Sequence, residues 1–228
     1  ACNCYSKNLS SSDSTSDGAK PNYLKDWAIS KYYEQVGKSD KEITEEIAFD
    51  LPNGWSWCRL KDICSIFTGA TFKKEETVTT KEGVRILRGG NISPFELRIK
   101  DDDIFLTKDK VKEDIILKEN DILTPAVTSL ENIGKMVRVN SDMPNTTVGG
   151  FVFIIRLYLK NQWLSKYILY LLSSPFMIDF MKSITNKSGQ AFYNIGKERL
   201  STALLPIPSL AEQHRIVAQI EKLFEQLR

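Results

Sequence analysis

The end of the chain constrains its fold more than any other segment. Residues 204–208 read Leu-Leu-Pro-Ile-Pro, an apolar run typical of a strand and closed by two prolines. Proline has no backbone N–H to donate, so regular pairing must end there. Ser209 and Glu212 then have the spacing of a capping box, in which each side chain satisfies a backbone N–H of a first helical turn. We predict a strand into Pro206 and a helix that begins near Leu210.

Apolar residues recur every three or four positions along this helix and form one stripe. The members of the stripe are Ile216, Val217, Ile220, Leu223, Phe224 and Leu227. At ~1.5 Å per residue, residues 210–228 span about 28 Å. We predict that the helix projects as an arm whose stripe binds a partner; packing of the stripe on its own domain is the alternative.

Charge is unevenly distributed along a chain that is otherwise ordinary in composition. The 228 residues are 42% hydrophobic and 26% charged, with a net charge of +2. Residues 160–206 carry six Lys or Arg against two acidic residues, whereas residues 95–121 carry nine acidic against six basic ones. This distribution fits a protein with one positive docking face, and it fits chance clustering equally well.

The cysteines and the single histidine do not predict a metal site. Cys58 and Cys64 are isolated, Cys2 and Cys4 lie in a polar tail, and His214 is far away. Zinc needs about four ligands at short paired spacing. We expect reduced, partly buried thiols in a cytosolic protein, and no apolar run approaches the ~20 residues that span a bilayer.

Catalytic motifs fail one by one. A phosphate-binding P-loop needs four residues between its glycines and a hydroxyl after the lysine. Here six residues separate Gly189 from Gly196, and Glu198 stands where the hydroxyl belongs. His214 is expected to be a solvated helix residue, and the run 101–103 a solvated acidic turn rather than a cation site. We predict that the chain is not an enzyme by itself.

The chain divides into four parts by composition. Residues 1–20 are predicted to be a disordered tail, residues 21–48 a linker with a short helix near 23–33 and a charged stretch at 39–46, residues 49–207 a folded domain, and residues 208–228 the start of a coiled-coil spacer helix. Trp55, Trp57 and Trp163 are expected in the core.

Short β-forming runs and polar turns dominate the first part of the domain. The expected strands are 84–87, 103–106, 121–124, 135–139 and 150–159. Two helices follow, at 163–172 and, behind an N-cap at Ser174 and Pro175, up to about 184. A polar loop is expected at 186–194 and one helical turn within 195–201. The fold class is therefore α+β: a single twisted, mostly-β domain with flanking helices and a C-terminal amphipathic helix.

Several polar segments carry the side chains that proteins use to contact DNA. Arg and Lys neutralise phosphates and read guanine, Asn and Gln pair with adenine, and Ser and Thr do either. Solvated loops are the alternative for each segment. We predict one positive DNA-binding surface made of Lys73, Lys74, Arg85, Arg88, Asn91, Thr128, Ser129, Lys187, Ser188, Gln190, Asn194 and Lys197.

A series of short motifs follows the chain over most of residues 41–228. They are residues 45–60, Thr68-Gly69, residues 86–92, residues 119–123, Gly149-Gly150-Phe151, Tyr167 with Tyr170-Leu171-Leu172, and residues 206–217. Each is weak alone, but this order and spacing resemble the specificity subunits of type I restriction-modification systems. Asn120 departs from the resemblance, because the family has glycine there.

The resemblance implies a non-catalytic target-recognition domain. Such a domain would read one half of a bipartite site in double-stranded DNA and dock a methyltransferase subunit. S-adenosylmethionine, ATP and Mg²⁺ would belong to the methyltransferase and restriction–translocase partners. Family members carry two such domains separated by two antiparallel helices, so we expect a fragment, a truncated subunit or a half-subunit that forms an antiparallel homodimer through residues 210–228.

Two other readings stay open. The chain could be the recognition domain of a single-chain restriction-methylation enzyme, which methyltransferase motifs upstream in a longer reading frame would reveal. It could also be a scaffold that binds only protein through its C-terminal helix. DNA binding that weakens steeply with salt would exclude the scaffold.

Overall fold

A four-stranded antiparallel sheet lies at the centre of the computed structural model, which describes residues 32–36, 39–79, 82–188 and 191–227. Its strand order is β12–β10–β14–β4. The strands are β12 (Val137–Arg138), β10 (Ile122–Pro125), β14 (Val152–Leu157) and β4 (Cys64–Thr68). β14 pairs with β10 along one side and with β4 along the other, so β4 is an edge strand.

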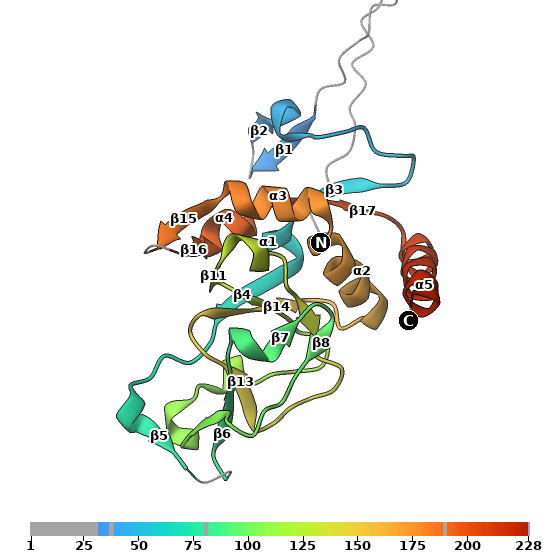
Figure 1. Ribbon diagram of the computed structural model, residues 1–228. Helices are drawn as coiled ribbons and strands as arrows, with labels where there is room; N and C mark the ends of the chain where they lie inside the picture. Colours follow the sequence, from blue (N-terminus) through green and yellow to red (C-terminus); the bar gives the residue numbers. More distant parts are fainter. Residues whose placement is uncertain (1–31, 37–38, 80–81, 189–190, 228) are drawn as a thin grey trace, which may run out of the picture.

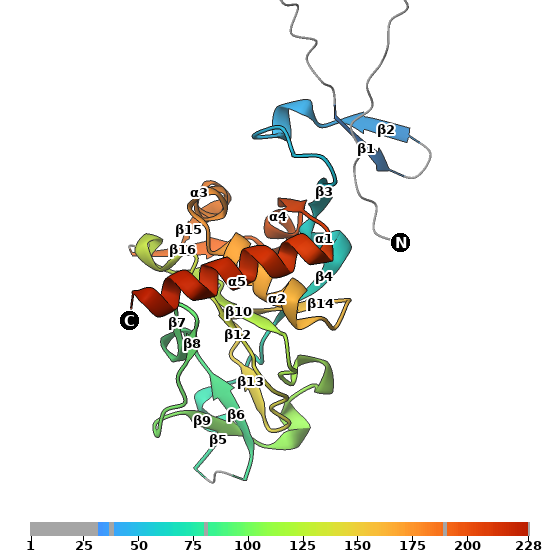
Figure 2. The same ribbon diagram turned by 90° about the vertical axis from the view of Figure 1, so that its right-hand side faces the viewer.

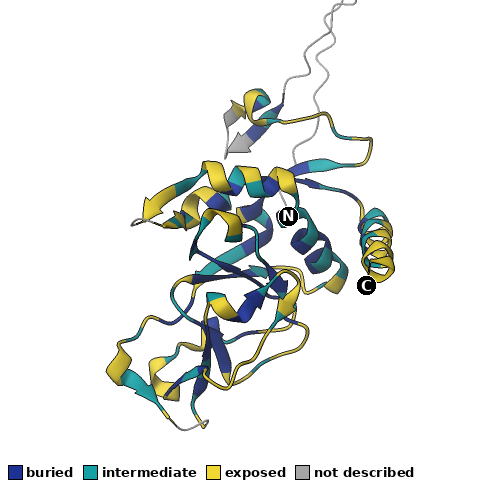
Figure 3. Cartoon of the chain, in the orientation of Figure 1, coloured by how far each residue is buried: buried dark blue, intermediate teal, exposed yellow. Residues whose placement is uncertain are grey.

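Both faces of the central sheet are buried. Successive side chains of a strand point to opposite faces. Phe153 and Ile155 of β14 therefore enter one hydrophobic core, while Val152 and Ile154 enter a second core. This two-sided burial explains why residues 152–157 form an almost continuous apolar run, and Figure 3 shows the buried residues concentrated on these strands.

Helices and two small sheets cover one face of the central sheet (Figure 1). We call this part the helical lobe. Its helices are α1 (Leu60–Ile63), α2 (Gln162–Leu172), α3 (Pro175–Ser183), α4 (Lys197–Ser201) and α5 (Leu210–Gln226). Its strands are β3 (Ser56–Arg59) paired with β17 (Leu204–Ile207), and the sheet of β11 (Val127–Thr128), β16 (Phe192–Ile195) and β15 (Thr185–Ser188).

A second sheet covers the other face, and we call this part the strand lobe. Its strand order is β13–β6–β9–β5, with β13 parallel to β6 and the other pairs antiparallel. The strands are β13 (Thr146–Val148), β6 (Val84–Leu87), β9 (Ile104–Leu106) and β5 (Thr77–Val78), with the hairpin β7 (Ile92–Ser93) and β8 (Glu96–Leu97) beside them. Short 3₁₀ helices occur at Thr44–Glu46, Lys74–Glu76, Gly89–Asn91, Lys108–Lys110, Glu113–Ile115 and Leu130–Asn132.

The α+β class is confirmed, and each of the five expected strands is present. The strand at 84–87 has the predicted bounds, the one expected at 121–124 is shifted by one residue to 122–125, and the other three are shorter than predicted. The expected loop at 186–194 is wrong, because β15 and β16 pair across it as a hairpin. β16 also pairs with β11, so tertiary pairing outweighs the polar composition of this segment. Ser174 caps α3 as predicted, its side chain accepting from the Met177 N–H. Trp57 is fully buried, whereas Trp55 and Trp163 are only partly buried.

The segment expected to be a linker forms structure of its own. β1 (Tyr33–Val36) and β2 (Ser39–Glu42) pair as an antiparallel hairpin, followed by the 3₁₀ helix at Thr44–Glu46. The expected helix near 23–33 is therefore wrong at Tyr33, and its residues 23–31 lie outside the described residues, as does the expected tail at 1–20.

Arg59 joins this hairpin to the helical lobe. Its guanidinium contacts the Glu34 carboxylate at 2.8 Å and the Glu46 carboxylate at 2.7 Å, and it donates to the Thr202 carbonyl at 2.8 Å. Burial by itself would lower the pKa of Arg59, but the two carboxylates outweigh it and raise the pKa. The hydrogen bond from Arg59 in turn lowers the pKa of Glu46.

The C-terminal helix begins as predicted but is capped by only half of a capping box. The Ser209 hydroxyl accepts from the Glu212 N–H at 3.4 Å. The reciprocal contact is replaced, because the Glu212 carboxylate binds Arg215 at 2.6 and 2.8 Å.

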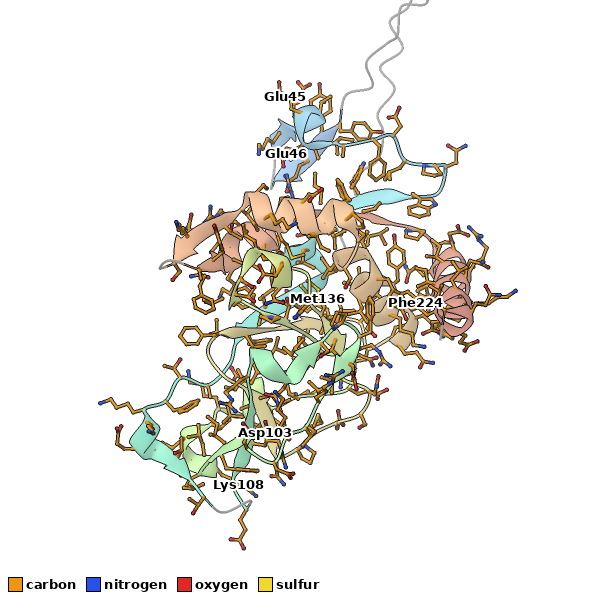
Figure 4. All side chains as sticks on the ribbon, in the orientation of Figure 1. Glu45, Glu46, Asp103, Lys108, Met136 and Phe224 are labelled. Carbon is orange, nitrogen blue, oxygen red and sulfur yellow. The ribbon has the colours of Figure 1, made fainter. Side chains whose placement is uncertain are left out.

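α5 folds back along α2, so the prediction of a projecting arm is wrong for residues 210–227. Val217 is fully buried in the helical lobe. Figure 2 shows α5 lying alongside α2. At one end of the contact the ring centroids of Trp163 and His214 are 3.9 Å apart. At the other end the ring of Phe224, which Figure 4 labels, lies 5.9 Å from that of Tyr170. The two helices therefore run side by side in the same direction.

We expect substitution of Arg59 to destabilise the chain strongly. Arg59→Met removes the buried cation that contacts the carboxylates of Glu34 and Glu46, and removal of one partner of a buried ion pair costs about 3–5 kcal/mol. Arg98→Met is the control, because Arg98 pairs with Glu96 on the exposed surface and should change the free energy of unfolding by less than about 1 kcal/mol. Urea denaturation measures both variants, and equal losses would contradict the role of Arg59.

Candidate nucleic-acid interface

A trough lies between the two lobes, along the edge of the central sheet formed by β4. It consists of two adjoining hollows of about 440 and 560 Å³ that share Ala70 and Thr71. The first hollow is lined by residues 66–71, Lys110, Lys112, Asp114, Ile115 and Lys197. The second is lined by residues 70–72, Arg88, Gly89, Val127 and residues 149–152. Each lobe therefore supplies one wall of the trough.

The floor of the trough is held rigidly by close backbone contacts. A Cβ atom on Gly69 would collide with the Val148 carbonyl oxygen, so only glycine fits there. The Ala70 N–H donates to the same carbonyl at 2.8 Å, and the Gly69 N–H donates to the Val152 carbonyl at 3.3 Å. These bonds attach the end of β4 to the turn between β13 and β14.

Basic side chains from both lobes surround the trough. Lys110, Lys112 and Lys197 line the first hollow together with one carboxylate, Asp114, and Arg88 lines the second hollow. Lys110 also contacts Glu76 at 3.2 Å, which ties its 3₁₀ helix to the one at Lys74–Glu76. A concave surface with an excess of positive charge attracts polyanions.

About half of the predicted DNA-binding residues are placed in or beside this trough. Arg88 and Lys197 line it, and Lys73 and Lys74 directly follow the lining residue Phe72. The β15–β16 hairpin, which lies on the same side of the molecule as β5 in Figure 1, exposes three more candidates. These are Lys187, Ser188 and Asn194. Gln190 lies outside the described residues.

Asn91 is not available to DNA, which corrects its assignment as a base-reading residue. It is 1% exposed. Its amide oxygen accepts from the Arg88 N–H at 2.8 Å, and its amide nitrogen donates to the Arg98 carbonyl at 2.8 Å and to Asp103 at 2.6 Å. Its hydrogen-bonding groups are thus used to fold the strand lobe.

Arg85 contacts the same buried carboxylate, that of Asp103, which Figure 4 labels in the strand lobe. Its guanidinium contacts Asp103 at 2.8 Å and stacks on the Phe105 ring at 4.9 Å. Burial alone would raise the pKa of Asp103, but hydrogen bonds from the Lys100 N–H, Asn91 and Arg85 outweigh it and lower the pKa. Arg85 is therefore a structural residue rather than a free DNA contact.

Thr128 and Ser129 are also weaker candidates than their chemistry suggested. Thr128 is 8% exposed. The Ser129 hydroxyl donates to Glu131 at 2.6 Å and accepts from Asn132 at 2.8 Å within one 3₁₀ turn. Thr128 is therefore buried at the end of β11, and the Ser129 hydroxyl is already bonded within the chain.

Two lysines of the trough were missed by the sequence analysis. Lys110 and Lys112 lie within residues 95–121, where acidic residues outnumber basic ones. The net charge of residues 95–121 is negative and therefore gives no sign of two lysines that the fold places at a basic site. Their alternation with Asp109 and Val111 was the only local signal.

Two of the four cysteines lie within the described residues. Cys58 and Cys64 are buried free thiols, and burial raises the pKa of Cys64 to about 12. Within the described residues, no three His, Cys, Asp or Glu side chains are grouped closely enough to hold a metal ion. None of the described helices is both long and apolar enough to cross a membrane.

The α+β fold and a family model together identify the class of protein. Residues 52–228 match the family model of the type I restriction modification DNA specificity domain, and the chain belongs to this family. More particularly, it is similar to specificity subunits of type I restriction enzymes. It is 29% identical over 199 residues to the EcoAI specificity subunit of Escherichia coli, a match that covers 79% of this chain and 30% of that subunit.

Further relatives share the same name and fold. The EcoBI specificity subunit of Escherichia coli is 26% identical over 210 residues, covering 83% of this chain and 40% of that subunit. The HsdS subunit from Thermoanaerobacter tengcongensis superposes with a TM-score of 0.53 at 23% identity, covering 78% of this chain and 39% of that one. The chain thus spans between 30% and 40% of the length of these relatives. The relatives are specificity subunits, in agreement with the prediction that the chain is not itself catalytic.

The carboxylate of Asp103 should make the free energy of unfolding depend on pH in the acidic range. Its pKa is lower in the folded chain than in the unfolded chain, so its contribution is present above about pH 4 and is lost as pH falls through the folded-state pKa. We expect Asp103→Asn to lower the free energy of unfolding at pH 7 and to flatten its fall between about pH 4 and pH 2. The exposed Asp101→Asn is the control, and denaturation at a series of pH values measures both.

Proposed function

We propose that the trough binds double-stranded DNA and that the chain reads one half of a bipartite site. The observation that carries this proposal is the placement of Lys110, Lys112, Lys197 and Arg88 around one trough, although the net charge of the chain is only +2. Membership in the DNA specificity family supports it.

The two hollows would contribute differently to binding. The lysines of the first hollow are suited to phosphates, which position a protein on DNA without reading its sequence. Arg88 is suited to a base edge, because its guanidinium is half exposed and contacts the exposed Asp102, at 3.3 Å to the backbone carbonyl and 3.5 Å to the carboxylate. The exposed Lys187 and Asn194 of the β15–β16 hairpin would extend the reading surface.

A second surface is suited to protein. Ile216, Ile220, Leu223 and Leu227 follow one another at intervals of four, three and four residues, as in a coiled-coil seam. The first two are half-buried, whereas Leu223 is 49% and Leu227 83% exposed. We call these four residues the α5 seam. It is distinct from Val217, which packs inside the helical lobe.

The α5 seam would pack against a second long helix. In our proposal that helix comes from a second copy of the chain, and the pair docks methyltransferase and restriction subunits that hold S-adenosylmethionine, ATP and Mg²⁺. An apolar hollow of about 540 Å³ beside Ile216 and Ile220, lined also by Phe49, Leu51 and Trp55, would enlarge this surface. We place the assembly in the cytoplasm.

Loss of a trough lysine should weaken DNA binding evenly across sequences. Each of Lys110→Ala, Lys112→Ala and Lys197→Ala removes one phosphate contact, so the slope of log affinity against log salt should fall by about 1 for each variant. Fluorescence anisotropy with a 20-bp duplex of arbitrary sequence, between about 50 and 200 mM salt, measures this slope.

Lys222→Ala is the matched control for these variants, because it removes an exposed lysine from α5 on the other side of the molecule. An unchanged slope in all the trough variants, or an equal loss in the control, would exclude the trough as the DNA-binding surface.

Charged substitutions in the α5 seam should separate assembly from folding. Ile220→Asp combined with Leu223→Asp places charges in the α5 seam, where Ile220 is half-buried and Leu223 is 49% exposed, so we expect a folded chain that has lost its dimer or its methyltransferase partner. Val217→Asp should instead unfold the helical lobe, because Val217 is fully buried. Circular dichroism and analytical ultracentrifugation distinguish the outcomes. Unfolding of the seam variant, with no assembled species in the wild type, would contradict the proposal.

A further inference from the structure

Phe151 is the most exposed aromatic side chain in the described part of the molecule. It is 73% exposed, whereas Phe192 on the β15–β16 hairpin is 55% exposed. Phe95, also exposed, has ring partners, because it lies 5.5 Å from Tyr170 and 5.4 Å from Phe224. A single exposed apolar ring is common on protein surfaces, but one that lines an apolar hollow together with other apolar residues marks a candidate binding site.

The backbone that carries Phe151 is held in place on both sides. The Phe151 carbonyl accepts from the Ala126 N–H at 2.8 Å, and the Gly149 N–H donates to the Leu87 carbonyl at 2.8 Å. A Cβ atom on Gly150 would lie 2.8 Å from the Thr71 hydroxyl. The ring is therefore presented by a fixed turn, and little backbone freedom remains to be lost when it binds.

The surroundings of the ring select one kind of ligand. Phe151 lines the second hollow of the trough with Phe72, Val127 and Arg88. The first hollow, which shares Ala70 and Thr71 with it, carries the three trough lysines. A ligand that satisfies both hollows must combine negative charge with a flat apolar face, and the stacked bases of a nucleic acid between their phosphates do so.

Resting on the function proposed above, we propose that Phe151 is a stacking wedge that inserts at one base step of the bound duplex. Inserted apolar side chains partly unstack a step and kink the DNA. Pyrimidine–purine steps unstack most readily, so the wedge reads deformability at its step and contributes to specificity without a hydrogen bond to a base. Arg88, on the same hollow, contacts a base edge exposed by the kink.

The test uses a duplex selected by the wild-type chain from a randomised library, with 2-aminopurine placed at each purine position in turn. This base becomes brighter when it is unstacked. We expect a severalfold rise in fluorescence at one step on binding the wild type, no rise with Phe151→Ala, and a retained rise with Phe151→Trp. Affinity for the selected duplex should fall roughly 5- to 150-fold in Phe151→Ala, as expected for one lost stacking contact of ~1–3 kcal/mol.

Leu159→Ala is the control, because Leu159 is 64% exposed and follows the opposite end of β14. It should bind like the wild type, and both variants should keep the wild-type melting temperature. Phe151→Ala with wild-type affinity and the same fluorescence rise would overturn the wedge and leave DNA binding by the trough intact. Failure of the wild type to select any duplex would overturn both proposals.

Discussion

Burial of both faces of the central sheet is the constraint on which the rest of the structure depends. β14 sends Phe153 and Ile155 into one core and Val152 and Ile154 into the other. A lobe must therefore cover each face, because either face left in water would expose a row of large apolar side chains. The sheet ends at β4, and the trough lies along that edge with one wall from each lobe.

The same arrangement separates two surfaces of different chemistry. The trough combines a lysine-lined hollow with a more apolar hollow that carries Arg88, and it lies on the side of the β15–β16 hairpin and β5. The α5 seam is apolar, and α5 lies on the opposite side of the molecule, to the right of α2 in Figure 1. In the function proposed above, the trough would hold DNA while the α5 seam faces a protein partner.

Local patterns predicted the elements well and the site only in part. The apolar stripe of α5 and the end of the strand before it could be predicted from the sequence, because helical periodicity, prolines and N-caps act over a few residues. The hairpin at 185–195 and the buried role of Asn91 were not, because each depends on partners distant in sequence, β11 for one and Asp103 for the other. Asn120 shows how a departure is accommodated: it takes the left-handed φ of 71° where relatives of this kind are expected to have glycine, and its side chain accepts from Arg138 and Ser165.

Hydrogen–deuterium exchange with and without DNA tests the central claim most directly, namely that the trough holds DNA while the α5 seam stays free. With a selected duplex bound, we predict slower exchange in residues 66–72, 108–115 and 185–197, and unchanged exchange in residues 216–227. Protection confined to residues 216–227, or absent from both walls of the trough, would contradict this account.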